Sequence, residues 1–203
     1  QLWNSAIDAS QKASESDLYT QRDALNVCWA VLKTVGSQAG LNSSMITNLA
    51  EKAANLVSKE TENVDEATFD FVLAAVGLLG TAATVDVDVE INRTVSQFLL
   101  HLISIFTSPE FVNCKSSSKI RAFDVVLTSL EQLIEIYSDG DAPYDDPVFV
   151  GDGYIAKLES LEPKVKEMYK KIDKNQHPMM KHRAEDVWQT LLQFILYKRL
   201  EKL

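Results

Sequence analysis

The sequence is poor in the residues that interrupt regular backbone structure and in those that form crosslinks. It holds 7 glycines and 5 prolines among 203 residues, so long segments can remain regular. The two cysteines, Cys28 and Cys114, lie in different segments and outside any C-x-x-C pair. This spacing gives no support to a disulfide or zinc framework, and we interpret both residues as reduced thiols of an intracellular protein.

Long hydrophobic runs and a leader segment are also lacking. No stretch of about 18 uncharged apolar residues occurs, so the sequence predicts no membrane span. The chain begins at Gln1, without a methionine and without a basic segment followed by an apolar signal core. We therefore expect it to be a fragment or a processed product of a longer protein.

The motifs of common enzyme classes are absent as well. The sequence has no phosphate-binding glycine loop, no H-E-x-x-H and no G-x-S-x-G, and its three histidines are scattered. The pair Asp139 and Asp141 suggests a calcium loop, but Pro143 and Tyr144 occupy the positions of a ligand and of the required glycine. We predict a protein that is not an enzyme and that needs no cofactor or metal.

What the chain does have is apolar residues at helical spacing almost throughout. The segments with this spacing are approximately residues 2–13, 17–35, 43–59, 65–80, 90–107, 120–137, 152–173 and 179–200. Residues 84–91 alternate as a strand would, but no partner strand exists, so we interpret them as a loop. Pro163 should kink or split the segment in which it lies. The sequence predicts an all-α fold of about eight helices.

An internal repeat in the sequence favours a solenoid over a compact bundle. Residues 121–130 and 183–192 share Arg, Ala, Asp, Val, Thr and Leu in register, with weaker echoes around Asn26 and Asp70. The anchor positions 26, 70, 124 and 186 approximate the spacing of HEAT and armadillo units, about 40–47 residues, with insertions in the later units. We predict a single HEAT/armadillo-like segment over residues 1–203, with an acidic, Pro/Asp-rich loop at 138–153. A single compact helical bundle remains the alternative.

Charge is unevenly distributed along the chain. Residues 1–153 hold 9 Lys/Arg and 22 Asp/Glu, whereas residues 154–203 hold 11 and 7. On the predicted helix 120–137, Asp124, Thr128, Glu131 and Glu135 form a continuous polar stripe opposite the apolar face. The stripe is either a solvated face or an acidic surface for a Lys/Arg-rich protein. The candidate partner-binding residues are Asp124, Glu131, Glu135, Asp139, Asp141, Tyr144, Asp145 and Asp146.

The predicted helix 152–173 has the opposite character. Lys157, Lys164 and Lys171 recur every seven residues, but Glu159 and Glu167 are among the acids that interrupt them. A solvated helix face is the simpler interpretation, and contact with RNA phosphates is the alternative.

Three stretches from about residue 120 onward look familiar: Phe123-Asp-Val-Val-Leu-Thr-Ser-Leu-Glu-Gln-Leu-Ile-Glu-Ile-Tyr-Ser-Asp-Gly140, Leu158-Glu-Ser-Leu-Glu-Pro163 and Leu192-Gln-Phe-Ile-Leu-Tyr197. Together they resemble the C-terminal HEAT region of the symportin family, which implies that the chain is the C-terminal part of a longer protein. Symportins are chaperone–adaptors that carry 5S-RNA-binding ribosomal proteins of the large subunit into the nucleus.

This resemblance implies a scaffold whose acidic surface shields a basic ribosomal protein, in the cytoplasm and in the nucleus. It implies a monomer that binds neither DNA nor membrane. The family's N-terminal import signal and armadillo repeats have no counterpart in this sequence, so we expect import itself to reside elsewhere. The alternatives are an import-receptor-like segment, or an architectural segment that only stiffens a larger complex.

Overall fold

The computed structural model describes residues 17–36, 42–58, 64–85, 88–113, 119–138 and 152–200. Within these ranges every regular element is a helix. The helices are α2 (Leu18–Val35), α3 (Ser43–Ser58), α4 (Glu66–Val85), α5 (Val89–Phe106), the short α6 (Pro109–Asn113), α7 (Lys119–Ser138), α8 (Asp152–Lys171) and α9 (Pro178–Leu200). The predicted all-α class is confirmed. The predicted helix at residues 2–13, and residues 139–151 of the acidic loop, lie outside the described residues.

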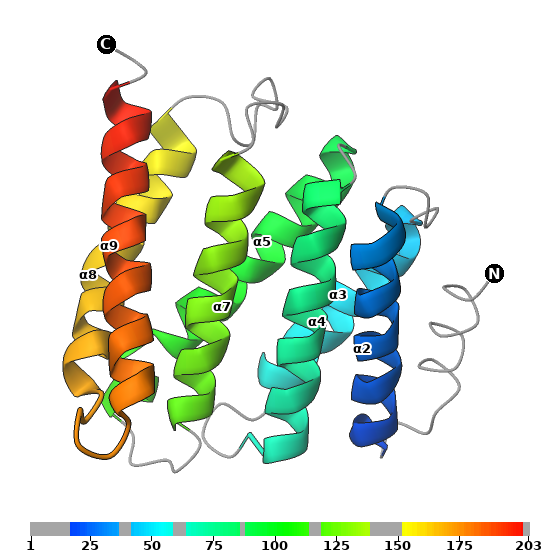
Figure 1. Ribbon diagram of the computed structural model, residues 1–203, viewed down its shortest axis with the longest axis horizontal. Helices are drawn as coiled ribbons and strands as arrows, with labels where there is room; N and C mark the ends of the chain where they lie inside the picture. The colour runs from blue at the N-terminus through cyan, green and yellow to red at the C-terminus, as the bar shows by residue number, and fades with distance from the viewer. Residues whose placement is uncertain are drawn as a thin grey trace.

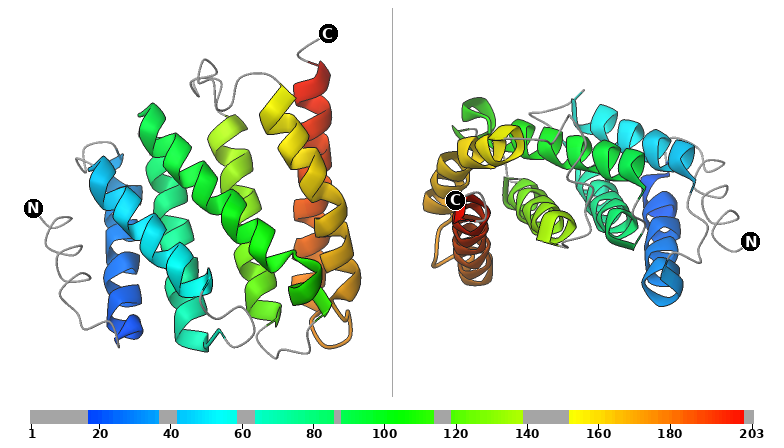
Figure 2. Two further views of the ribbon diagram at one scale, coloured as in Figure 1. Left: turned by 180° about the vertical axis from the view of Figure 1, so that it is seen from behind. Right: turned by 90° about the horizontal axis from the view of Figure 1, so that it is seen from above.

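The helices form two layers. Helices α2, α4, α7 and α9 stand side by side in one layer, which we call the inner layer and which faces the viewer in Figure 1. Helices α3, α5 and α8 form the other layer behind it (Figure 2). Successive long helices alternate between the layers, which is the arrangement of stacked helical hairpins. The predicted helical-repeat solenoid is thereby confirmed over the compact bundle.

The inner layer is the hollow side of the array. Seen from above, α2, α4, α7 and α9 follow a shallow arc that opens away from α3, α5 and α8 (Figure 2). Sequence alone did not indicate which face is concave. In repeat proteins, the concave side of such an array serves as an extended binding surface.

Helix α4 is the centre of the core. Its neighbours are α2 and α7 in its own layer and α3 and α5 in the other. Phe69, Phe71, Leu78 and Leu79 are at most 1% exposed. By length and composition α4 could cross a membrane, and 72% of its most apolar window is buried in the fold. Contacts on several sides explain a helix that is apolar nearly all round.

Asparagine and aspartate side chains define where several helices begin. Asp65 accepts a hydrogen bond from the backbone N–H of Thr68 at 2.7 Å and so starts α4. Asp88 accepts from the N–H groups of Glu90 and Ile91 at 2.8 and 3.2 Å, and so starts α5. At the start of α3, Asn42 accepts from the N–H of Ser44 at 3.0 Å.

One predicted boundary in the middle of the chain was wrong. Helix α4 does not end at Gly80 but continues to Val85, whereas α5 begins at Val89, close to the predicted start at about residue 90. Of the alternating stretch 84–91, the residues that the structure describes are helical apart from Asp88, which caps α5, so the expected loop was wrong for them. Gly80 has a packing role instead, because a Cβ atom there would lie 1.9 Å from the Gln132 Oε1 atom of α7.

Prolines produce two further differences from the sequence prediction. Pro163 was expected either to kink or to split its segment, and because helix α8 runs unbroken through it, the split was wrong. Pro109 starts the short helix α6, which the apolar spacing did not reveal because it is only 5 residues long.

Candidate protein-binding groove

A groove runs along the inner layer. Its volume is about 650 Å³, and residues of α2, α4, α7 and α9 line it. The charged residues among them are two arginines and four carboxylates: Arg22, Asp23, Asp70, Asp124, Glu131 and Arg183. The lining therefore carries an excess of negative charge. We call this feature the inner groove.

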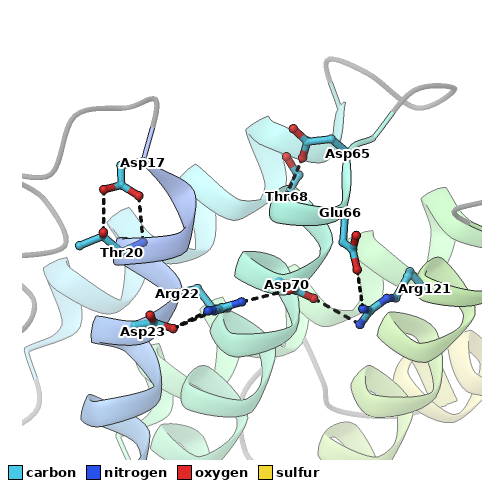
Figure 3. A network of polar contacts seen from close by, with 9 residues as sticks. All are labelled: Asp17, Thr20, Arg22, Asp23, Asp65, Glu66, Thr68, Asp70 and Arg121. Atoms are coloured by element: carbon cyan, nitrogen blue, oxygen red, sulfur yellow. Dashed lines mark hydrogen bonds and ion pairs between the residues drawn. The ribbon is translucent and has the colours of Figure 1, made fainter.

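An ion-pair chain links the first three helices of the inner layer. Asp70 of α4 lies between two arginines, with its Oδ2 atom 3.1 Å from Arg22 Nη1 and its Oδ1 atom 3.3 Å from Arg121 Nη1. Figure 3 shows the arginines of α2 and α7 reaching Asp70 from opposite sides. Each arginine has a second acidic partner, Asp23 for Arg22 at 2.7 Å and Glu66 for Arg121 at 2.9 Å. These ion pairs thus join three successive helices of the inner layer across their surfaces.

A second cluster joins α7 to α9 around Arg183. The Arg183 Nε and Nη2 atoms donate to the two carboxylate oxygens of Glu131 at 3.2 and 2.6 Å. Nη2 also donates to Thr128 Oγ1 at 2.9 Å, and Nη1 is paired with Asp124. Partial burial lowers the pKa of Arg183, but hydrogen bonds and charges of Glu131 and Asp124 outweigh that effect and leave the pKa raised. The guanidinium is therefore held as a cation by three side chains of one neighbouring helix.

These contacts explain the repeat noticed in the sequence. In residues 121–130 and 183–192 an arginine opens the shared pattern. In the structure Arg121 of α7 pairs with Asp70 of α4, the preceding inner helix, and Arg183 of α9 pairs with Asp124 of α7, again the preceding inner helix. The arginine and the aspartate of the repeat therefore form an ion pair between successive inner helices, made each time from one inner helix back to the previous one.

The predicted partner-binding residues divide into three groups. Asp124 and Glu131 line the inner groove, where they bind Arg183 of the chain itself. Glu135 is exposed and its Oε2 atom lies 3.3 Å from Gln132 Nε2. Asp139, Asp141, Tyr144, Asp145 and Asp146 lie outside the described residues. Their role in binding a partner stays a prediction.

The groove has an aromatic end that sequence reasoning missed. Trp29 of α2 donates from Nε1 to Thr81 Oγ1 at 2.9 Å, and Lys33 Nζ lies 4.1 Å from the ring centre. Gly77 allows the approach of α2 to α4, because a Cβ atom there would lie 3.0 Å from the Trp29 ring. The roles of Arg22, Asp70 and Trp29 were not predicted. The weak echo at positions 26 and 70 was the only signal that pointed to these two helices.

The lysines of α8 lie in the other layer and are partly engaged by α8 and α9. Lys166 Nζ lies 5.1 Å from the centre of the Trp188 ring, and Lys171 pairs with Glu167 at 3.6 Å. Acidic residues of α8 also bind α9, since Glu159 holds Arg199 at 2.8 Å. These interleaved partners favour the solvated-face interpretation of α8 over a phosphate-binding surface. Among the residues described here, no group of three or more His, Cys, Asp or Glu side chains could hold a metal ion.

Fold and groove together define the class, an α-solenoid with a charged groove along its inner helices. The chain belongs to the family described as "SYO1-like, TPR repeats", whose sequence profile matches residues 1–202. The family match therefore extends over nearly the whole chain, beyond the region from residue 120 in which the symportin resemblance was noticed.

Named relatives support the same family. Symportin 1 of Chaetomium thermophilum is 24% identical over 204 residues, which cover 98% of this chain and 28% of the relative. Synchronized import protein 1 of Saccharomyces cerevisiae is 24% identical over 201 residues, covering 95% of this chain and 30% of the relative. The Schizosaccharomyces pombe "Armadillo repeat protein involved in nucleocytoplasmic transport Syo2" is 31% identical over 130 residues, or 64% of this chain and 17% of the relative. The chain thus spans less than a third of the length of these relatives.

Proposed function

We propose that this chain is a non-catalytic, protein-binding segment of a nuclear-import adaptor, and that its inner groove holds a basic stretch of a protein cargo. The observation that carries the proposal is the groove itself, in which four carboxylates and two arginines line the hollow side of the solenoid. A basic segment would find an excess of negative charge there, and its electrostatic complementarity would favour both encounter and orientation.

The relatives support the adaptor part of the proposal. One of them is named for import and another for nucleocytoplasmic transport. We extend this role to the present chain, with residence in both cytoplasm and nucleus. Symportins carry 5S-RNA-binding ribosomal proteins of the large subunit, and we propose such a protein as the cargo.

The overall charge agrees with a protein cargo rather than nucleic acid. The net charge of -9 repels a phosphate backbone, so we propose neither DNA nor RNA as the partner. We also propose that the chain acts as a monomer. An import-receptor-like segment, or an architectural segment that binds no cargo, are the alternatives that the experiment must separate.

A binding experiment with matched charge variants tests the proposal. The chain is immobilised and exposed to a panel of purified large-subunit ribosomal proteins at moderate salt. In the first variant, Asp23→Lys places a positive charge on the rim of the groove, where the Asp23 side chain is 66% exposed. The control is Glu51→Lys, which makes the same charge change on an exposed residue of α3 in the other layer.

We expect one basic protein to be retained, and Asp23→Lys to weaken its binding about fivefold while Glu51→Lys leaves it unchanged. A third variant, with Asp139, Asp141, Asp145 and Asp146 changed to Asn, tests the acidic loop separately. Equal weakening by the α2 and α3 variants would show that only net charge matters. Retention of no protein by the unmodified chain would favour the architectural alternative.

A further inference from the structure

The cluster around Arg183 has the geometry of a site for an arginine side chain. Asp124, Thr128 and Glu131 lie on one face of α7, at spacings of four and three residues along the helix. Glu131 receives two parallel hydrogen bonds from one guanidinium, while Asp124 and Thr128 bind its outer nitrogens. A planar guanidinium matches this fork of acceptors, and the ammonium group of lysine, as a point charge, does not.

This site opens onto the inner groove rather than into the core. The four residues of the cluster all line the groove, and the Arg183 side chain keeps 34% of its surface exposed. The cluster is therefore reached from the groove and not from the core.

Helix α9, which supplies Arg183, packs on α8 and on α7. Helix α8 packs chiefly on α9. The Arg183 cluster is a polar link between this last hairpin and the rest of the array. A guanidinium from outside could replace Arg183 without disturbing the apolar core that α4, α5 and α7 share.

We infer that Asp124, Thr128 and Glu131 form an arginine-binding site, which Arg183 of the chain itself occupies until an arginine of the partner exchanges with it. The inference rests on the proposed function, because it assigns the partner's arginine to the inner groove. It adds a specificity that net charge does not provide, a preference for arginine over lysine at the α7–α9 end of the groove. It also gives Arg183 an autoinhibitory role.

The test compares labelled nona-arginine and nona-lysine peptides as probes. The variant Arg183→Gln vacates the site while keeping a side chain of similar length. The matched control is Arg199→Gln, because Arg199 makes an equivalent two-pronged contact with Glu159 at 2.9 and 2.8 Å outside the inner groove. Affinity is measured by fluorescence anisotropy, and circular dichroism establishes that each variant is folded.

We expect Arg183→Gln to bind nona-arginine about fivefold to tenfold more tightly than the unmodified chain, with a smaller change for nona-lysine. Arg199→Gln should bind both peptides as the unmodified chain does. Adding Glu131→Gln to Arg183→Gln should abolish the gain and the preference for arginine, because the two-pronged acceptor is then lost.

The outcomes separate the inference from the proposed function. If the unmodified chain binds the peptides but Arg183→Gln binds them equally or more weakly, the arginine site is refuted and the basic-cargo groove stands. If neither the chain nor the variant binds, both are refuted.

A second measurement on the unmodified chain covers the case in which Arg183→Gln does not fold. The Nε–H signal of Arg183, assigned with Arg183→Lys, should lose its protection from solvent exchange when nona-arginine is added. Protection that persists at saturating peptide would refute exchange.

Discussion

Asp70 is the residue whose replacement tests the inner-layer ion pairs most directly. Its side chain is 19% exposed and lies between arginines of the two flanking helices, at 3.1 Å from Arg22 and 3.3 Å from Arg121. Asp70→Asn keeps the shape of the side chain and removes its charge. The two arginines then face each other across an amide, although each retains a second carboxylate.

The expected size of the effect lies between two limits. Buried hydrogen bonds to charged groups contribute about 1.5–3 kcal/mol, whereas exposed ion pairs contribute about 0.2–1 kcal/mol. Asp70 is mostly covered, but Arg121 is 44% exposed, which places the pair between these limits. We expect Asp70→Asn to lower the free energy of unfolding by about 1–2 kcal/mol.

Urea unfolding followed by circular dichroism measures this change, and a double-mutant cycle assigns it. Arg121→Gln should cost less in the Asp70→Asn background than in the unmodified chain, with a coupling energy of about 1 kcal/mol. Salt at about 1 M should reduce the coupling, since these groups are only partly shielded from solvent. As a control, Glu159→Gln on α8 should show no coupling with Arg121→Gln. A coupling of zero between Asp70 and Arg121 would refute the claim that this pair holds α4 and α7 together.

Two further predictions concern the thiol in α2 and the start of α5. Burial raises the pKa of the Cys28 thiol to about 11, and the residue is 1% exposed. In a Cys114→Ser variant, a thiol reagent such as DTNB should therefore react with the native protein at about pH 8 far more slowly than with the unfolded chain. The reaction of the native protein should become faster as the pH rises toward that pKa. Equal rates for the native and unfolded states would show that α2 does not cover this residue. Asp88→Ala should lower the free energy of unfolding by about 1 kcal/mol. Asp88→Asn should lower it by much less, because asparagine can still accept hydrogen bonds from the backbone N–H groups that begin α5. Equal losses of stability in urea titrations of the two variants would contradict the cap.

The helices were predictable because their signals are local. Apolar residues at intervals of three and four located most helices from the sequence alone. The errors occurred where tertiary packing overrides a local signal. Gly80 looks like a helix end, yet it sits inside α4 because Gln132 of α7 packs against it. Pro163 looks like a break, yet α8 continues through it.

The candidate groove was predictable only in part, for a related reason. Helical spacing identified Asp124, Thr128 and Glu131 as a polar face of one helix, and that was correct. What lies opposite such a face depends on the position of another helix, which no local pattern contains. The sequence showed Arg183 only as one residue of the repeated motif and did not indicate that it would contact this face of α7.

The sequence by itself therefore determined the class of fold, the positions of most helices and the family, because periodicity, capping residues and family resemblance are properties of the chain order. Only the tertiary structure decided that α2, α4, α7 and α9 share the hollow side, that Asp70 lies between two arginines, and that the acidic stripe of α7 already holds a guanidinium. Partners so distant along the chain meet because the helices stack in two layers, and the stacking depends on the apolar faces of all the helices together.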